Sequence, residues 1–283
     1  MRRAGWAAML TVVALSASVG CSSPDSDGQS QPSTRAQLAH VHGLGVDPAD
    51  GTLYVGSHHG LFTVPVDGDS IEGPVAGLIR DFMGFTIIGP GHFLGSGHPG
   101  PGDDALNPLG LIESTDGGQT WTTRSLSGEV DFHALTYRHG TAYGVDAMSG
   151  QLLVSTDLVD WEVRSTEPMI DVAVSPDDAD TLLATTPRGV LASSDGGRSF
   201  SALEPAPQLL LLSWAEDGTL VGVDPGGTVF VRAPTDAGFT RVGQLAGAPE
   251  ALYAVDGSTV YAAARGALWR STDGGATFQP HPS

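Results

Sequence analysis

Nine histidines stand out among the residues of this 283-residue chain that could do chemistry, and all but His281 lie before residue 140. Neutral imidazole is a good ligand for borderline transition metals such as zinc and copper, and methionine thioether suits copper. No H-x-x-H or H-E-x-x-H segment occurs, so no local motif accounts for a metal site. Such a site would have to be assembled by the fold from distant segments.

Carboxylates are the second group with catalytic potential, and they dominate the charge of the chain. There are 32 Asp and Glu against 13 Lys and Arg, a formal net charge of -19 at pH 7, and every basic residue is Arg. This balance offers neither the basic face that nucleic-acid phosphates need nor electrostatic attraction to anionic lipid. We therefore expect no nucleic-acid partner.

The elements that must position these residues are short β-type runs, separated from about residue 40 onward by turn signals roughly every eight to twelve residues. One turn recurs almost unchanged three times, with a degenerate and an eroded copy besides, at residues 114–121, 193–200, 271–278, 155–161 and 235–239. The aspartates of successive copies are 37 to 41 residues apart. A period near forty residues with four strands per period is typical of β-propeller blades.

This repeat predicts an all-β fold, a single β-propeller with six blades of four antiparallel strands, and seven blades are the alternative. The expected blades are residues 40–78, 79–128, 129–168, 169–206, 207–246 and 247–283. The second blade carries an insertion rich in Pro and Gly at residues 98–108. The sequence does not indicate how the ring closes, although the segment before residue 40 is a candidate for a closing strand.

The recurring turn has the pattern S-x-D-x-G-x-[TS]-[WF], which resembles the Asp-box or BNR repeat. Its Asp can accept backbone N–H bonds inside a tight hairpin, its Gly supplies a positive φ, and its aromatic residue buries apolar surface. We interpret these residues as turn-stabilising, against the alternative of a repeated calcium or carbohydrate site. The resemblance implies that the hairpins lie on the outer rim, away from the ligand face. The structural aspartates are Asp116, Asp157, Asp195 and Asp273.

One face of the predicted propeller collects a biased set of side chains. The strands of a blade run A to D from the channel outward, so the starts of the A strands and the B–C loops share a face. Those positions are rich in histidine in the first three blades, and His40 is among them. The expected ligand face comprises His42, His58, His59, Met83, His98, His133, Asp146, Met148 and Arg188.

This face is open to two kinds of chemistry. Imidazoles converging from neighbouring blades would bind copper or zinc, and the candidate ligands are His42, His58, His59, His98 and His133. A carboxylate pair would suit glycoside hydrolysis, and the candidate catalytic residues are Asp81, Asp131, Asp146 and Glu250. The alternative is that the histidines are polar channel-lining residues, solvated by water or hydrogen-bonded within the structure.

The N-terminal segment is interpreted as an export signal and a tether. Arg2 and Arg3 precede an apolar stretch too short to span a bilayer comfortably, and small residues lead to Cys21, the only cysteine. The pattern resembles a bacterial lipobox, which implies cleavage before Cys21 and its lipidation; the alternative is secretion with a free thiol. The expected division is a signal peptide (1–20), a lipidated cysteine with a flexible tether (21–38) and the propeller (39–283).

Three stretches, residues 40–62, 81–90 and 92–100, are similar to a group of bacterial BNR-repeat lipoproteins of the YVTN/BNR-like propeller superfamily. These are labelled glycosyl hydrolase or exo-sialidase-like, and the resemblance, which covers most of the mature chain, implies glycoside hydrolysis. Sialidases hold the substrate carboxylate with three Arg, the first usually in Arg-Ile-Pro, and use a Tyr paired with a Glu as nucleophile. This chain has no Arg-Ile-Pro, and its five Tyr lie in apolar strand contexts.

Three functions from different classes remain open. The first is a lipid-anchored propeller that binds a metal ion, a small polar ligand or a glycan on its His-rich face, with copper or zinc as the expected metal. The second is an active glycoside hydrolase, and the third is a scaffold that assembles an envelope protein complex. In each case we expect an exported monomer on the outer side of the cytoplasmic membrane or at the cell surface, touching the membrane only through its lipid.

Overall fold

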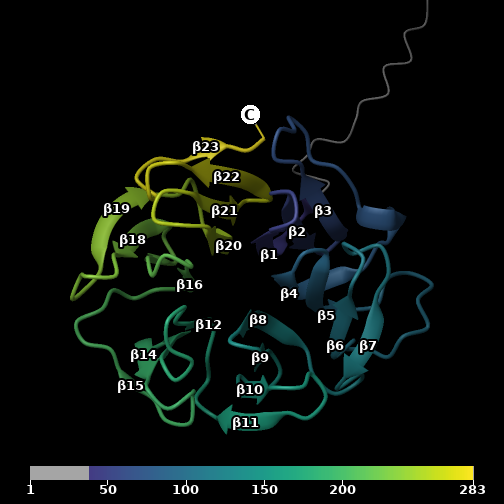
Figure 1. Ribbon diagram of the computed structural model, residues 1–283, viewed down its shortest axis with the longest axis horizontal. Coiled ribbons are helices and arrows are strands. Elements are labelled where there is room, and N and C mark those ends of the chain that lie inside the picture. The colour runs from purple at the N-terminus through teal and green to yellow at the C-terminus, as the bar shows by residue number, and fades with distance from the viewer. Residues whose placement is uncertain (1–37, 283) are drawn as a thin grey trace, which may run out of the picture. The chain divides into compact units, whose positions relative to one another are not determined.

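The computed structural model describes residues 38–282, and within them the chain forms six antiparallel sheets around a central channel (Figure 1). The prediction of an all-β, six-bladed propeller is therefore confirmed. The described residues do not include the predicted signal peptide, the predicted lipidated Cys21 or the predicted tether before residue 38. Among residues 38–282, no helix has the length and apolar character needed to cross a bilayer.

Each blade is built from one contiguous segment of chain, and the strands fall within the predicted blade boundaries. Blades one to three contain β1 (Val41–Val46), β2 (Leu53–Ser57) and β3 (Gly60–Val64); β4 (Asp81–Gly89), β5 (His92–His98), β6 (Leu111–Ser114) and β7 (Thr122–Ser125); β8 (Phe132–Arg138), β9 (Thr141–Asp146), β10 (Leu152–Ser155) and β11 (Glu162–Ser165). Blades four to six contain β12 (Asp171–Val174), β13 (Leu182–Thr186), β14 (Gly189–Ser193) and β15 (Ser201–Ala202); β16 (Leu211–Trp214), β17 (Leu220–Val223), β18 (Thr228–Arg232) and β19 (Thr240–Gln244); β20 (Pro249–Ala254), β21 (Val260–Ala264), β22 (Ala267–Ser271) and β23 (Gln279–Pro280).

Blade one differs from the expectation of four strands in every blade, because its sheet contains only three. A single bridge between Thr63 and Glu72 stands in for the fourth strand, with mutual backbone hydrogen bonds of 2.8 and 2.9 Å. A single 3-10 turn, η1 (Val75–Gly77), follows. The segment that follows β3 begins with Pro65, which has no N–H to donate to a ladder, and includes a run of polar and glycine residues that favour turns.

The core lies between successive blades. Strands in the middle of a blade, such as β10 and β17, are buried along their whole length because neighbouring blades cover both faces of the sheet. The outermost strands β7 and β11 are largely exposed. Close approach of the innermost strands requires glycine at Gly84, where a Cβ atom would lie 2.5 Å from the carbonyl oxygen of Phe132 in the next blade.

The ring closes where blade six meets blade one. Strand β1 packs against β20 and β21, and the backbone N–H of Val41 donates to Glu250 Oε2 at 3.1 Å. Leu38 is fully buried in the same hydrophobic cluster as Ala251 and Leu268. Closure among the described residues therefore depends on side-chain packing and one carboxylate rather than on a strand exchanged between the ends of the chain.

The Asp-box turns are C–D hairpins, as predicted, and their aspartates hold them together. Asp195 Oδ1 accepts the N–H of Ser199 at 2.9 Å, and its Oδ2 accepts the Ser199 hydroxyl at 2.6 Å. These bonds lower the pKa of Asp195 to about 2. The next residue, Gly196, donates its N–H to Asp180 in the A–B turn of the same blade at 3.0 Å. The Asp-boxes therefore lie on the face of the propeller opposite the B–C loops.

We predict that Asp195→Asn lowers the melting temperature at pH 7 by a few degrees, because an amide cannot accept all of these hydrogen bonds. The folded pKa of about 2 lies below the ordinary 3.8, so this stabilisation is complete above about pH 4 and is lost as the pH falls towards 2. Thermal melts from pH 7 to pH 2 measure the effect. Asp236→Asn, in the eroded repeat copy, is the matched control, and equal melts for the two variants would contradict the role assigned to Asp195.

Candidate functional site

The innermost strands of four blades are irregular near the face on which the histidines were predicted. Strands β1, β4, β8 and β20 each contain a shift in register near their start, whereas β12 and β16 pair regularly. Such β-bulges re-aim a side chain and are common beside functional sites. The residues left out of regular pairing occupy equivalent positions in four blades and are His42, Met83, His133 and Glu250.

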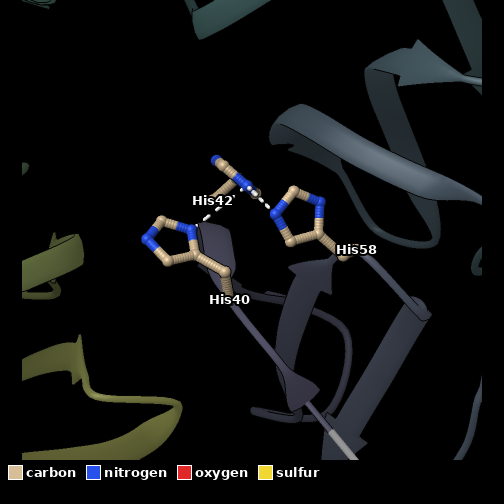
Figure 2. Close-up of side chains that lie close together, drawn as sticks. All are labelled: His40, His42 and His58. Carbon is tan, nitrogen blue, oxygen red and sulfur yellow. Dashed lines mark hydrogen bonds between the residues drawn. The ribbon is translucent and has the colours of Figure 1, made fainter.

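Three imidazoles converge at this face (Figure 2). His40 directly precedes β1, His42 is its second residue, and His58 follows β2 in the turn to β3. His40 Nδ1 is 3.2 Å from His42 Nε2, which in turn is 3.3 Å from His58 Nε2. The three ligand atoms all lie within 4.8 Å of one another, close enough to share one metal ion.

A carboxylate fixes the orientation of His58. Asp81 Oδ1, at the start of β4, lies 2.7 Å from His58 Nδ1. A proton on Nδ1 serves this bond, so neutral His58 directs the lone pair of Nε2 towards the other two rings. Metal-bound histidines typically donate their second ring nitrogen to a carboxylate in this way. Asp81, predicted as a candidate catalytic residue, here acts on the imidazole.

The central ring of the group, His42, is strongly biased towards its neutral form. Burial lowers the pKa of His42 to about 3, with repulsion from His40, His58 and His133 acting in the same direction. Only Asp131 opposes this shift. Neutral imidazole is the form that binds a metal, so no proton has to leave this ring at neutral pH before coordination.

A second carboxylate–imidazole pair stands beside the first. His133, near the start of β8, has its Nε2 atom 2.9 Å from Asp131 Oδ2, and its ring centre is 6.1 Å from that of His42. His98 approaches the same oxygen at 3.5 Å, while its Nδ1 bonds Asn107 in the blade-two insertion at 2.6 Å. Asp131 is buried, and its Oδ1 atom has no hydrogen-bonding partner among residues 38–282.

The central channel reaches this group of rings. Its cavity of about 760 Å³ is lined by the innermost strands of all six blades, and both His42 and His133 contribute to its wall. Asp171 lines it further round, where its carboxylate accepts the N–H of Leu212 at 2.8 Å and links blades four and five. Burial raises the pKa of Asp171 to about 6.

The structure brings together His42, His58, His98 and His133. The other predicted ligand-face residues differ in their exposure and in their contacts. The His59 side chain is exposed and is not one of the three converging imidazoles. Met148 is 76% exposed, and Arg188 pairs with Glu167 at the surface. Met83 is buried at its bulge. Asp146 Oδ2 accepts the Ser149 hydroxyl at 2.6 Å within its own turn.

His40 was expected on this face, but it is not among the metal ligands predicted from the sequence. The pattern His-Val-His contained the necessary signal, because residues two apart on an extended strand point to the same side. Glu250, a candidate catalytic residue, has both oxygens occupied: Oε2 accepts Val41 N–H, and Oε1 accepts Gly266 N–H at 2.8 Å. Its contacts give it a role in ring closure.

Comparison with known proteins supports the fold and the repeat. A BNR/Asp-box repeat model matches residues 112–123, which include most of β6 and the first Asp-box. No curated protein matches the chain. Three of the solved structures similar to it share 12 to 14% identity with it, a level that shows the fold alone.

The first of these structures is an ancestral GH74 enzyme, with a TM-score of 0.53, 14% identity and 82% of this chain covered, although the chain spans only 36% of that enzyme. The second belongs to a nidogen/laminin complex, with a TM-score of 0.62, 12% identity, and coverage of 81% of this chain and 91% of that one. The third is a gluconolactonase from Xanthomonas campestris, with a TM-score of 0.60, 14% identity and coverage of 82% and 85%.

We predict that His42 in the metal-free protein stays neutral down to about pH 3, whereas an exposed histidine gains its proton near pH 6.5. Because the pKa of His42 is lower in the folded state, only the unfolded state takes up this proton between pH 6.5 and 3. The free energy of unfolding therefore decreases as the pH falls through this range. Nitrogen chemical shifts of the ring, assigned with His42→Gln, give the measurement. A His42 titration midpoint near 6.5 would contradict the burial argument.

Proposed function

We propose that this protein is a metal-binding β-propeller, which holds a zinc or copper ion between His40, His42 and His58 at one mouth of its central channel. The observation that carries the proposal is the convergence of three ring nitrogens from β1 and the β2–β3 turn. Bonds of about 2.0–2.1 Å put the ligand atoms of a tetrahedral ion roughly 3.3 Å apart and those of a square plane roughly 2.9 Å apart. The observed separations of 3.2 and 3.3 Å match the tetrahedral value.

The protonation pattern also favours a cation over hydrogen bonds among the rings. With the Nδ1 proton of His58 held by Asp81, its Nε2 atom is an acceptor. The Nε2 atom of His42 faces that acceptor and also Nδ1 of His40. If His42 carries a proton on Nε2, this one N–H has to serve two acceptors at long distances. If His40 donates instead, the acceptor nitrogens of His42 and His58 face each other, whereas a metal ion accepts all three lone pairs. Asp81 then stabilises the bound ion as an outer-shell carboxylate.

Glycoside hydrolysis receives less support from the same contacts. All four candidate carboxylates are engaged within the protein: Asp81 and Asp131 by imidazoles, Asp146 and Glu250 by backbone N–H groups. The GH74 enzyme resembles this chain in fold only. A glycosidase needs one carboxyl group to donate a proton and the other to attack or activate water, and these contacts favour metal binding instead.

We expect the purified protein to bind one Zn²⁺ or Cu²⁺ ion, and His42→Ala and His58→Ala each to lose affinity by more than the roughly 10–100-fold typical of an outer-shell change. Asp81→Asn should show a loss within that range, because it removes only the support of His58. Calorimetric titration with each metal measures these affinities.

Two control variants test whether the loss is specific. His59→Ala removes an exposed imidazole next to His58, and His139→Asn removes one in an A–B turn, where Asn tolerates the positive φ of 54°. Both should bind metal as the natural protein does. Equal and weak binding by the natural protein and His42→Ala would leave the rings as a solvated polar lining and refute the proposal.

The proposed location of this site is outside the cytoplasmic membrane, on a lipid anchor at Cys21. This rests on the sequence alone, namely an Arg-led apolar stretch that ends in small residues before the single cysteine. A bacterial host expressing the full chain should incorporate labelled fatty acid into it and retain it in the membrane fraction. Cys21→Ala should abolish both, and unchanged labelling of that variant would contradict lipidation at this residue.

A further inference from the structure

The three-imidazole group leaves a coordination position to be filled. Zinc and copper bind at least three or four protein or solvent ligands, and sites that hold a metal permanently are usually closed by four protein ligands. Among residues 38–282, one group of three or more His, Cys, Asp or Glu residues has its ligand atoms within 4.8 Å of one another. Its members are His40, His42 and His58. A fourth protein ligand would therefore have to move a short distance towards them.

We propose that His133 supplies this fourth ligand through Nδ1, so that four imidazoles surround one zinc or copper(II) ion. This inference rests on the proposed metal-binding function. His133 and His42 are the bulged residues of β8 and β1, so both are displaced from regular pairing at the same level of the channel. Both line the cavity wall, and their ring centres are 6.1 Å apart.

The hydrogen bonding of His133 leaves the correct atom available. Its Nε2 atom bonds Asp131 Oδ2 at 2.9 Å, so a neutral ring carries its lone pair on Nδ1. This repeats the arrangement of Asp81 and His58 on the other side of His42. Asp131 is a positioning residue in this assignment, since it reaches the metal only through the imidazole.

The distances between ring centres show how far His133 would have to move. With bonds of about 2.0 Å, imidazoles on one ion have ring centres roughly 4.5 Å apart when adjacent in a square plane and roughly 5.2 Å apart in a tetrahedron. The ring centre of His42 lies 4.6 Å from that of His40 and 4.7 Å from that of His58. The two remaining measured separations are the longer ones, 5.7 Å for His40–His58 and 6.1 Å for His42–His133.

His133 therefore has to approach His42 by roughly 1 Å or more to share its ion. The nitrogen separations of 3.2 and 3.3 Å equal those around a tetrahedral ion, so the group suits zinc as well as copper.

Pulsed EPR of the Cu(II)-loaded full-length protein tests the assignment by counting coordinated imidazoles. We expect four in the natural protein and three in His133→Ala, with a loss of Cu(II) affinity of roughly tenfold or more in that variant. Asp131→Asn should retain four imidazoles and bind Cu(II) roughly 10–100-fold more weakly, a combination that general misfolding would not produce. His98→Ala is the matched control, because His98 also approaches Asp131 but bonds Asn107 through Nδ1, and it should retain four.

Three imidazoles in the natural protein, or an unchanged count in His133→Ala, would overturn the assignment of His133 while leaving the metal site in place. Loss of an imidazole in His98→Ala but not in His133→Ala would assign the fourth position to His98 and equally overturn the inference. Absence of any bound Cu(II), or a Cu(II) signal that survives in His42→Ala, would instead remove the proposed function and this inference together.

Discussion

The structure depends on closure of the ring, which brings the first and last blades together without a shared strand among the described residues. Glu250 performs this closure by accepting N–H groups from Val41 and, in its own blade, from Gly266. A partly buried carboxylate with two such donors is well satisfied, and its loss would leave the donors without partners. Because Val41 directly precedes His42, the contact that closes the propeller also fixes the position of the backbone that carries His42.

Comparable bonds join the other blades, and they use different residues at each junction. Asp47 accepts Gly91 N–H between blades one and two, and Ser96 accepts Phe132 N–H between blades two and three. His139 Nε2 bonds Ser175 O between blades three and four, Asp171 links blades four and five, and Ser213 accepts Ala254 N–H between blades five and six. Part of the acidic composition therefore serves assembly rather than chemistry.

The two faces of the propeller divide stability from chemistry. On one face, the Asp-box carboxylates are occupied by their own hairpins, and the adjoining Gly N–H groups tie those hairpins to the A–B turns. On the other, bulges in β1 and β8 turn imidazoles into the channel mouth, and Asp81 and Asp131 orient them. Among residues 38–282, no hydrogen bond connects the Asp195 hairpin with His42, His58 or His133. Substitutions in the repeat turns can therefore alter stability without disturbing the imidazoles.

The sequence by itself determined the number of blades and the positions of their turns, because each Asp-box is a local hairpin whose hydrogen bonds join residues two to four apart. It also predicted that six histidines share one face, since that follows from the alternation of turns along a blade. Only the tertiary structure decided which of these rings meet. The one-residue bulges at His42 and His133, the exposure of His59, and the pairing of Asp81 with His58 across two blades depend on how closely neighbouring blades pack, and this distance between segments is not encoded in any local pattern.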